Sequence, residues 1–360
     1  MKTIAAILIE LNRPLELVEL EIPPLQNGQV LVQMVYSGLC HTQLNEWKGK
    51  KGADPYLPHT LGHEGSGIVL EIGEGVTKVK PGDRVVLSWI KGRGLDVLGA
   101  SYQWEGRKVN SGAISTFMEK AVIAESRVIP IPDTIPFREA SLLGCAIPTG
   151  AGVVLNDMQL KAGQSVAVFG IGGIGLSALI AARSLNAYPI IAVDVVQEKL
   201  ERSKRAGATH ALHANESGMM EKLFAITQGK GLDFALECAG RKEVMETAFS
   251  CVKAPGGLCV LAGNLAKGEK IQIDPFDLIR GRRILGTWGG GTQLDEDVPR
   301  YIDLFFKERN SLDILISDEV PLGEINDLMA RLDQGKIARG LIALNLPVSI
   351  HKKVDLASYV

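Results

Sequence analysis

The chain has 360 residues, of which 46% are hydrophobic and 22% are charged, and its formal net charge is −2. This length favours two or three domains with a sizeable core, and the balanced charge argues against a nucleic-acid-binding protein. No apolar run reaches the roughly 18 residues that a membrane span needs, and the first residues lack an apolar secretory segment. We therefore expect a cytoplasmic protein without a membrane or nucleic-acid partner.

The first part of the chain, to about residue 135, consists of short strand patterns separated by turn residues. The runs are rich in Val, Ile and Leu, as expected of strands, and prolines, glycines and asparagines between them favour tight turns. They cover residues 3–10, 15–21, 30–36, 67–72 and 84–90. This part predicts an irregular β-domain, in which residues 91–112 show no clear period and are expected to form a surface lobe.

From about residue 163 the pattern changes to strands that alternate with helices. Residues 165–169 form an uninterrupted apolar strand, typical of a parallel sheet covered on both faces. Further strands are expected at 189–193, 211–213, 234–236, 258–261 and 283–287, and helices at 174–185, 197–206, 219–227 and 244–252. The alternation predicts an α/β fold with a doubly wound parallel sheet. Two later helices (295–309 and 323–334) and a strand (340–346) lie outside it, so we assign them to the first domain.

A glycine-rich turn joins the first strand of this sheet to its first helix. The turn has the pattern G-x-G-x-x-G, with Gly170, Gly172, Gly173, Ile174 and Gly175. Its glycines allow a tight bend and the close approach of a pyrophosphate, which the helix N-terminus binds. Asp194 lies 19 residues after the last glycine, where an acid binds the adenosine ribose and disfavours a 2′-phosphate. We predict an NAD site; the alternative is a plain glycine turn followed by a helix-capping aspartate.

Three residues from separate parts of the chain could hold a metal ion. Cys40, His63 and Cys145 offer two thiolates and an imidazole, and three such ligands with an open fourth position are typical of catalytic zinc. Two thiolates neutralise Zn²⁺, which would lower the pKa of an alcohol bound in the open position. Alone, each residue is more typical of a core, where a buried cysteine is a small hydrophobe. Their occurrence with a dinucleotide site favours the metal.

Four further motifs occur in a fixed order before the glycine-rich turn: 38–42 (GLCHT), 61–67 (LGHEGSG), 81–85 (PGDRV) and 144–150 (GCAIPTG). With that turn they make the chain, over about residues 3–345, resemble the zinc-dependent medium-chain alcohol dehydrogenases, especially the alcohol and glutathione-dependent formaldehyde dehydrogenase branch. The resemblance implies a GroES-like catalytic domain of residues 1–147 and 288–360 and a Rossmann NAD-binding domain of residues 148–287, with the active site in the cleft. It also implies a homodimer or homotetramer.

The resemblance implies roles for residues around the metal. Cys40, His63 and Cys145 match the ligands of the catalytic zinc. Glu64 matches a carboxylate behind the metal that can exchange with a ligand. Thr42 matches the hydroxyl that takes the proton of the alcohol.

It implies further roles around the cofactor and the substrate. His41 and Arg339 match residues near the cofactor pyrophosphate, and Lys199 matches a contact to the adenosine ribose. Thr149 matches a threonine that packs on the nicotinamide. Trp89 falls where an aromatic wall of the substrate pocket is expected.

The chain departs from the family pattern in three places. Many members bind a second, structural zinc through four cysteines in a lobe, but residues 91–112 contain no cysteine, so we predict one zinc per chain. An aspartate that accepts a hydrogen bond from the ligand histidine typically follows Cys-His-Thr; here Gln43 follows, and its amide oxygen can accept the same bond. Asn45 stands where some members have a relay histidine, so the proton is expected to leave through ribose hydroxyls and water.

These features predict reversible hydride transfer between NAD and a small-molecule alcohol, which could be a primary alcohol, a polyol or a sugar hydroxyl. Two alternatives remain open. One is a zinc-free enone or quinone reductase of the same superfamily that uses NAD(P)H, against which the three ligands and Asp194 argue. The other is a nucleotide-binding protein without catalysis, which only Gln43 favours.

Overall fold

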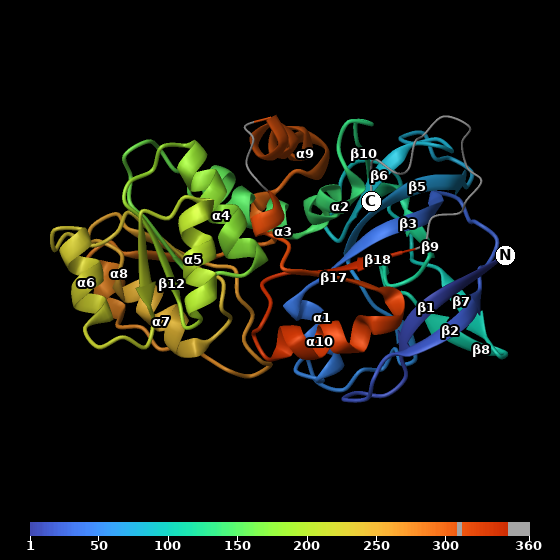
Figure 1. Ribbon diagram of the computed structural model, residues 1–360, viewed down its shortest axis with the longest axis horizontal. Coiled ribbons are helices and arrows are strands. Elements are labelled where there is room, and N and C mark those ends of the chain that lie inside the picture. Colours follow the sequence, from blue (N-terminus) through green and yellow to red (C-terminus); the bar gives the residue numbers. More distant parts are fainter. Residues whose placement is uncertain (308–311, 345–360) are drawn as a thin grey trace. The chain divides into compact units, whose positions relative to one another are not determined.

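The computed structural model describes residues 1–307 and 312–344, and the chain divides into two compact units. The first unit contains Met1–Cys145, Gln293–Val298 and the described residues from Ile316 onward, and the second contains Ala146–Thr292 and Pro299–Leu315. Both are drawn in Figure 1. None of the described helices combines the length and the apolar character that a membrane crossing requires.

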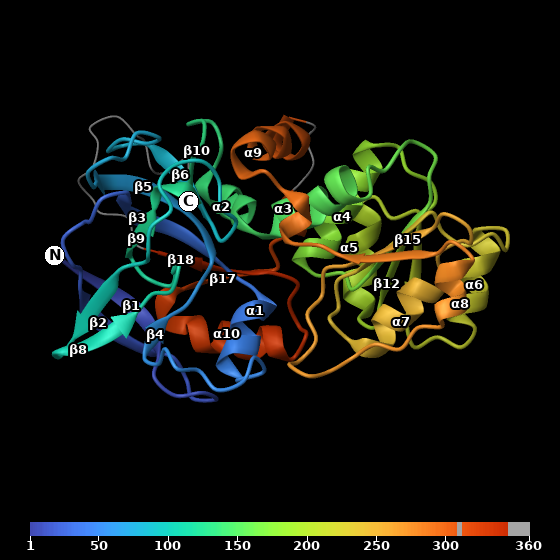
Figure 2. The same cartoon turned by 180° about the vertical axis from the view of Figure 1, so that it is seen from behind.

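Five strands of the first unit close into a small barrel in the order β1, β2, β7, β8, β4. Four of them (β1, β2, β4 and β8) are labelled in Figure 2. Their bounds are β1 Lys2–Leu8, β2 Glu16–Glu21, β4 His59–Thr60, β7 Ser101–Trp104 and β8 Arg107–Asn110. The antiparallel pair β1 and β2 supplies part of the core, because Ala5 to Leu8 of β1 are completely buried. The short strands agree with the irregular β-domain expected from the sequence.

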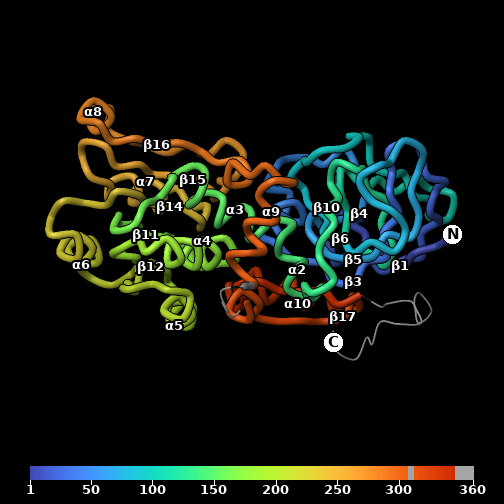
Figure 3. Tube along the Cα trace, turned by 90° about the horizontal axis from the view of Figure 1, so that it is seen from above, coloured from blue at the N-terminus to red at the C-terminus, as the bar shows by residue number. Residues whose placement is uncertain are grey.

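A seven-stranded sheet forms the rest of the first unit, with the order β10, β6, β5, β3, β18, β17 and with β9 also paired to β3. The bounds are β3 Gln29–Leu39, β5 Glu64–Ile72, β6 Arg84–Ser88, β9 Lys120–Ala124, β10 Val128–Pro130, β17 Asp318–Pro321 and β18 Gly340–Ala343. All eleven residues of β3 are buried, because this apolar strand is the centre of the sheet. Figure 3 shows the red strand β17 returning to the blue N-terminal strands.

The pairing of β3 brings distant residues to one end of this sheet. β3 and β5 are antiparallel, with Ser37 opposite Gly65, so the residues just after β3 and just before β5 lie together. β18 is also antiparallel to β3, with Gly340 opposite Leu39, which brings the residue before Gly340 to the same end. The helices of this unit are α1 His41–Trp47, α2 Phe137–Ala140 and α10 Ile325–Asp333.

The second unit is built on a six-stranded parallel sheet in the order β13, β12, β11, β14, β15, β16. Its strands are β11 Val166–Phe169, β12 Ile190–Asp194, β13 His210–His213, β14 Phe234–Glu237, β15 Leu258–Leu261 and β16 Arg283–Gly286. Its helices are α3 Ala146–Gly152, α4 Gly173–Ser184, α5 Gln197–Ala206, α6 Met219–Ile226, α7 Lys242–Ser250 and α8 Pro275–Ile279. The strand order reverses direction at β11, so right-handed crossovers place α4 and α5 on one face and α7 on the other. The predicted doubly wound sheet is confirmed.

The lobe at residues 91–112 contains a β-hairpin that the sequence analysis misses. Tyr102 of β7 and Val109 of β8 are completely buried, which fits two short strands with one inward face. The strands are joined by Glu105 and Gly106, both at positive φ, 49° and 74°. Hairpin turns of this type favour Asn-Gly or Asp-Gly, so a glutamate at the first position gave no turn signal.

Residues 308 and 309 of the helix predicted at 295–309 lie outside the described residues, and the rest of that stretch is divided between the two units. The helix α9 Leu294–Ile302 begins in the first unit, and the described residues of Pro299–Leu315 belong to the second, whereas the sequence pattern places this stretch in the first domain. The Tyr301 hydroxyl lies 2.8 Å from the Thr292 hydroxyl, which donates to the Pro148 carbonyl at 3.0 Å. These hydrogen bonds connect the segment to Thr292 and, through it, to Pro148, 144 residues before Thr292. No local sequence pattern predicts them.

Candidate metal centre and nucleotide site

Cys40, His63 and Cys145 converge at one end of the seven-stranded sheet. Cys40 lies between β3 and α1, His63 precedes β5, and Cys145 ends the turn Ser141–Gly144. The two sulfur atoms and an imidazole nitrogen all lie within 4.8 Å of one another, and His63 Nε2 is 3.2 Å from Cys145 Sγ. A nitrogen and two sulfurs at this spacing are the ligand types that zinc prefers, so the residues fit the ion.

The electrostatics of the cluster favour one thiolate even without a metal. The hydrogen bond from the Cys145 thiol lowers the pKa of Cys40 well below its usual value; burial opposes this shift and the Arg339 charge adds to it. The same hydrogen bond, together with burial, raises the pKa of Cys145. Cysteines bind metals as thiolates, so one of the two cysteines is already favoured in the form that binds a metal.

A buried ion pair lies beside the cysteines. The Arg339 guanidinium is bonded to the Glu64 carboxylate, and the two side chains are 4% and 0% exposed. Although burial alone would lower the pKa of Arg339, the charges of Glu64 and the cysteines raise it. A Cβ on Gly38 would lie 1.8 Å from Glu64 Oε1, so only glycine leaves room for this carboxylate. Glu64 and Arg339 are predicted separately from the sequence, whereas their contact is found only in the structure.

Gln43 contacts His63 with the opposite end of its amide from the one expected. The Gln43 Oε1 accepts the backbone N–H of Cys40 at 3.0 Å, and the Nε2 lies 2.6 Å from His63 Nδ1. The prediction that the amide oxygen accepts a bond from the imidazole is therefore wrong for this structure. The reason is local: Gln43 is the third residue of α1, and a Gln there often returns to the N–H of the capping residue.

The other residues assigned to the substrate or the cofactor in this part of the chain are close to Cys40 in sequence or lie in the same first unit. Thr42 follows in the first turn of α1, with its Oγ1 3.8 Å from Cys40 Sγ. His41 is the first residue of α1 and is exposed. Trp89 directly follows β6, and its carbonyl accepts a bond from Arg127. Their roles toward a substrate or cofactor stay predictions.

The glycine-rich turn of the second unit has the geometry that its pattern predicts. Gly170 adopts φ 92°, and a Cβ there would lie 2.8 Å from the Ala239 nitrogen. A Cβ on Gly175 would lie 2.2 Å from the Gly170 carbonyl oxygen, so helix α4 and strand β11 pack too closely for any side chain. Gly172, Gly173 and Ile174 complete the turn, and Gly172 precedes α4 directly. Thr149, on α3, is buried in this unit.

Asp194 is fixed against the same turn. Its Oδ2 accepts the Ile171 N–H at 2.7 Å and its Oδ1 accepts the Val196 N–H at 2.9 Å, and the side chain is buried at the end of β12. Each oxygen keeps further acceptor capacity for a hydroxyl. Lys199 is half-buried in the first turn of α5. The carboxylate is thus held rigidly beside the turn that the pattern assigns to a pyrophosphate.

Glu237 is a buried acid of this unit that the sequence analysis misses. It ends β14, and its Oε1 accepts the backbone N–H groups of Ala239 and Gly240, both at 2.8 Å. Burial raises the pKa of Glu237 to about 6, although these backbone bonds oppose the shift. Its place as the last residue of a buried strand is the sequence signal that could have singled it out.

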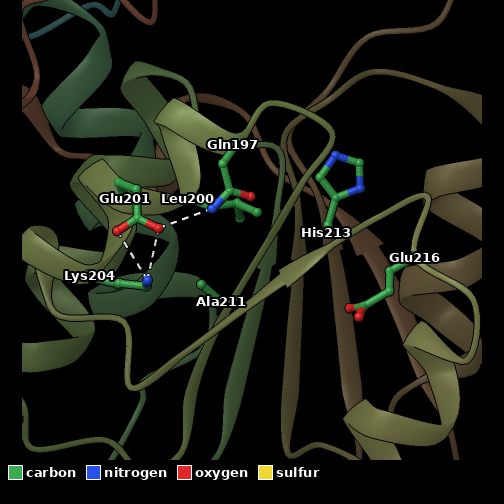
Figure 4. A pocket seen from close by; sticks show the side chains of 7 residues that line it. All are labelled: Gln197, Leu200, Glu201, Lys204, Ala211, His213 and Glu216. Carbon is green, nitrogen blue, oxygen red and sulfur yellow. Dashed lines mark hydrogen bonds and ion pairs between the residues drawn. The ribbon is translucent and has the colours of Figure 1, made fainter.

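A surface pocket also lies in the second unit, between α5 and β13 (Figure 4). It is lined by Gln197, Leu200, Glu201, Lys204, Ala211, His213 and Glu216. Glu201 accepts hydrogen bonds from Lys204 and Gln197 within it. Neither Asp194 nor Lys199 lines the pocket, so it contains no residue assigned to the nucleotide.

Two family models match the chain. The alcohol dehydrogenase GroES-like domain matches residues 26–133, and the zinc-binding dehydrogenase model matches residues 173–307. The S-(hydroxymethyl)glutathione dehydrogenase of Synechocystis sp. is 33% identical, covering 95% of this chain and 100% of that protein. Alcohol dehydrogenase class-3 of Zea mays is 32% identical, over 95% of this chain and 97% of its own length.

Solved structures give the same result. An alcohol dehydrogenase zinc-binding domain protein from Burkholderia ambifaria has a TM-score of 0.89 at 30% identity, covering 96% of this chain and 100% of its own. Benzyl alcohol dehydrogenase from Acinetobacter calcoaceticus has a TM-score of 0.87 at 29% identity, with the same coverage. The chain therefore belongs to the zinc-dependent medium-chain alcohol dehydrogenase family, with a GroES-like domain and a Rossmann fold. It is an enzyme, a zinc-dependent oxidoreductase of the alcohol dehydrogenase type.

Proposed function

We propose that this enzyme reversibly oxidises a primary alcohol with NAD, and that Cys40, His63 and Cys145 hold its one zinc ion. The observation that carries the proposal is the convergence of these two sulfurs and one imidazole nitrogen within 4.8 Å. Three protein ligands leave one position for a substrate oxygen. Zinc bound there would act as a Lewis acid toward that oxygen.

The remaining chemistry belongs to residues of the chain. Thr42 is proposed to accept the proton of the substrate hydroxyl at its Oγ1. His41, Thr149, Lys199 and Arg339 are proposed to orient the cofactor. Buried Arg339 keeps an Nε without a hydrogen-bond partner among the described residues, which supports a role toward an anionic oxygen.

The preference for NAD is proposed from the nucleotide turn. Asp194 presents an anionic carboxylate that accepts N–H groups of Ile171 and Val196. Such an acid accepts ribose hydroxyls and repels a 2′-phosphate. We propose a GroES-like part of residues 1–147 and 288–360 and an NAD-binding part of residues 148–287, from which the described residues of Pro299–Leu315 depart because they belong to the second unit.

A primary alcohol is proposed because of the relatives' names. Benzyl alcohol and an S-(hydroxymethyl) compound, which are named as substrates of two relatives, both carry a CH₂OH group. The alternative substrates are a polyol and a sugar hydroxyl, and a substrate screen must distinguish them from a simple primary alcohol. The cytoplasm is proposed as the location, supported by five free cysteines.

A homodimer or homotetramer is also proposed. β16 is the last strand of the parallel sheet, and Leu285 on it and Trp288 beyond it are 37% and 81% exposed. An exposed apolar sheet edge is a surface that a second copy can cover. Light scattering of the purified chain tests this proposal.

Elemental analysis of protein purified without added metal tests the function. One zinc per chain, lost in Cys40→Ser and His63→Ala, together with alcohol-dependent reduction of NAD⁺, is the expected result. Zinc-free protein that cannot be reconstituted, yet reduces enones or quinones with NAD(P)H, would contradict it. Two zinc ions per chain would contradict the single-site assignment.

A further inference from the structure

The Gln43 side chain contacts two nitrogen atoms at once, one at each end of its amide. Its Oε1 accepts the Cys40 N–H at 3.0 Å, and its Nε2 lies 2.6 Å from His63 Nδ1. Gln43 is 1% exposed, so bulk water does not compete for either contact. The orientation of this one amide therefore decides what two other groups can do.

The chemistry of an amide assigns the hydrogens in the metal-free protein. An amide nitrogen only donates, so the His63 Nδ1 beside it must accept. A neutral imidazole has one N–H, and the proton is then on Nε2. That is the nitrogen that lies 3.2 Å from Cys145 Sγ and faces the three-ligand cluster.

Coordination through Nε2 requires the opposite arrangement. The Nε2 proton must leave so that its lone pair can bind the metal, and Nδ1 must take up a proton if the ring is to stay neutral. Gln43 then faces two donors, the Cys40 N–H and the His63 Nδ1–H, with a single oxygen. Because these donors lie at opposite ends of the amide, its one oxygen reaches only one of them in this geometry, and the other donor loses its acceptor.

We propose that Gln43 is a positioning residue that turns its amide when the metal binds and thereby weakens metal binding. Its Oε1 leaves the Cys40 N–H and accepts the His63 Nδ1–H, because a metal-bound imidazole is the stronger donor. The buried Cys40 N–H is left without an acceptor, and the cap of α1 is lost. This inference rests on the proposed function, since it takes the cluster to be the zinc site.

A glutamate at position 43 removes the conflict without changing the shape of the side chain. Both of its oxygens accept, so it can satisfy the Cys40 N–H and the His63 Nδ1–H together. We expect Gln43→Glu to bind zinc about 10- to 100-fold more tightly than the wild type. Competition with a chromophoric chelator on the full chain measures both affinities.

A matched variant separates hydrogen bonding from charge. Asn45→Asp makes the same amide-to-carboxylate exchange on the same helix, two residues beyond Gln43. It is expected to leave the zinc affinity within about threefold of the wild type, since the charge of this partly exposed side chain is screened by water and salt. An equal gain in both variants would overturn the inference, because charge alone would then explain it.

The imidazole itself gives a readout that needs no zinc. Selective ¹⁵N labelling of the six histidines reports which ring nitrogen of His63 carries the proton. At a pH where the ring is neutral, we expect Nε2–H in the metal-free wild type and Nδ1–H in metal-free Gln43→Glu. Nδ1–H in the metal-free wild type would overturn the inference, even if zinc never binds and the proposed function fails.

Hydrogen exchange at Cys40 completes the test. Zinc loading of the wild type is expected to speed exchange of the Cys40 amide, whereas in Gln43→Glu its protection is kept. A metal ligand normally becomes more rigid on loading, so faster exchange would be specific to the lost bond. Unchanged or slower exchange in the loaded wild type would contradict the turning of the amide.

Discussion

The nucleotide turn and the metal centre are built in opposite ways. The turn uses consecutive residues, Gly170–Gly175, and its demands are backbone demands: a positive φ and the absence of a Cβ. The metal centre uses side chains from four distant segments, and the Glu64 to Arg339 contact spans 275 residues. A site made of local backbone can be recognised from a motif alone, whereas the supporting contacts of a site made by long-range packing require the structure.

The largest effect is expected from a substitution in the candidate metal centre, which should lower kcat and leave nucleotide binding unchanged. Cys40→Ser replaces a soft thiolate with a hydroxyl that zinc binds poorly. Lewis-acid assistance provides several kcal/mol of transition-state stabilisation, so kcat should fall about a thousandfold or more. Steady-state kinetics and zinc content measure the loss, and calorimetric titration with NADH should give an unchanged Kd. If the affinity for NADH fell by a factor similar to the loss of kcat, the two regions would not be independent.

The next largest effect is expected at the buried ion pair beside the proposed metal site. Glu64→Gln leaves the Arg339 charge buried without its partner, and such a loss costs about 3–5 kcal/mol of stability. Replacing both residues with methionine removes the uncompensated charge and should recover most of that loss. Urea unfolding of the full chain compares the two variants. A double variant no more stable than Glu64→Gln would mean that packing around Gly38, not charge, sets the cost.

The second unit, which contains the glycine-rich turn, also has a buried ionisable group, Glu237. Because the pKa of Glu237 is raised to about 6 from the usual 4.5, protonated Glu237 favours the folded chain. Its contribution to stability is full below pH 4.5 and is lost as the pH rises through 6, a change of about 2 kcal/mol. The wild type should therefore lose that amount relative to Glu237→Gln between pH 4.5 and 7, in urea unfolding at each pH. If the difference in the free energy of unfolding between the two proteins stays constant with pH, the pKa of Glu237 is not raised.

Much of the fold and the residue types of both sites could be predicted from the sequence. The alternation after residue 163 and the G-x-G-x-x-G pattern are periodic and local, so they predict α4, α5 and the parallel sheet. Cys40, His63 and Cys145 are predicted as metal ligands from their chemistry and from the family resemblance, and the structure brings them together. The hairpin at residues 101–110 could not be found, because Glu105 occupies a positive-φ position that turn rules give to Asn or Asp.

The orientation of Gln43 was beyond sequence reasoning for a different reason. The sequence gives an amide near a ligand histidine, but two partners compete for its oxygen. The capping bond to Cys40 depends on α1 beginning at His41, which no periodic pattern indicated. The same holds for Arg339, which reaches Glu64 only because β18 pairs with β3. Donor and acceptor roles at a site follow from such pairings, which lie outside any single motif.

The smallest expected effect tests whether the nucleotide region is wholly a backbone site. Asp194→Asn keeps a side-chain oxygen for the Ile171 N–H, removes the charge and replaces the acceptor of the Val196 N–H with an amide NH2. If the carboxylate repels a 2′-phosphate, the preference for NAD over NADP in kcat/KM should fall about tenfold, or 1.4 kcal/mol. Asp194→Ala should show the same change in ratio but weaker binding of both nucleotides, because the turn loses its acceptor. An unchanged ratio in Asp194→Asn would leave the turn as the sole determinant, and Asp194 would then serve the backbone geometry and not the choice of cofactor.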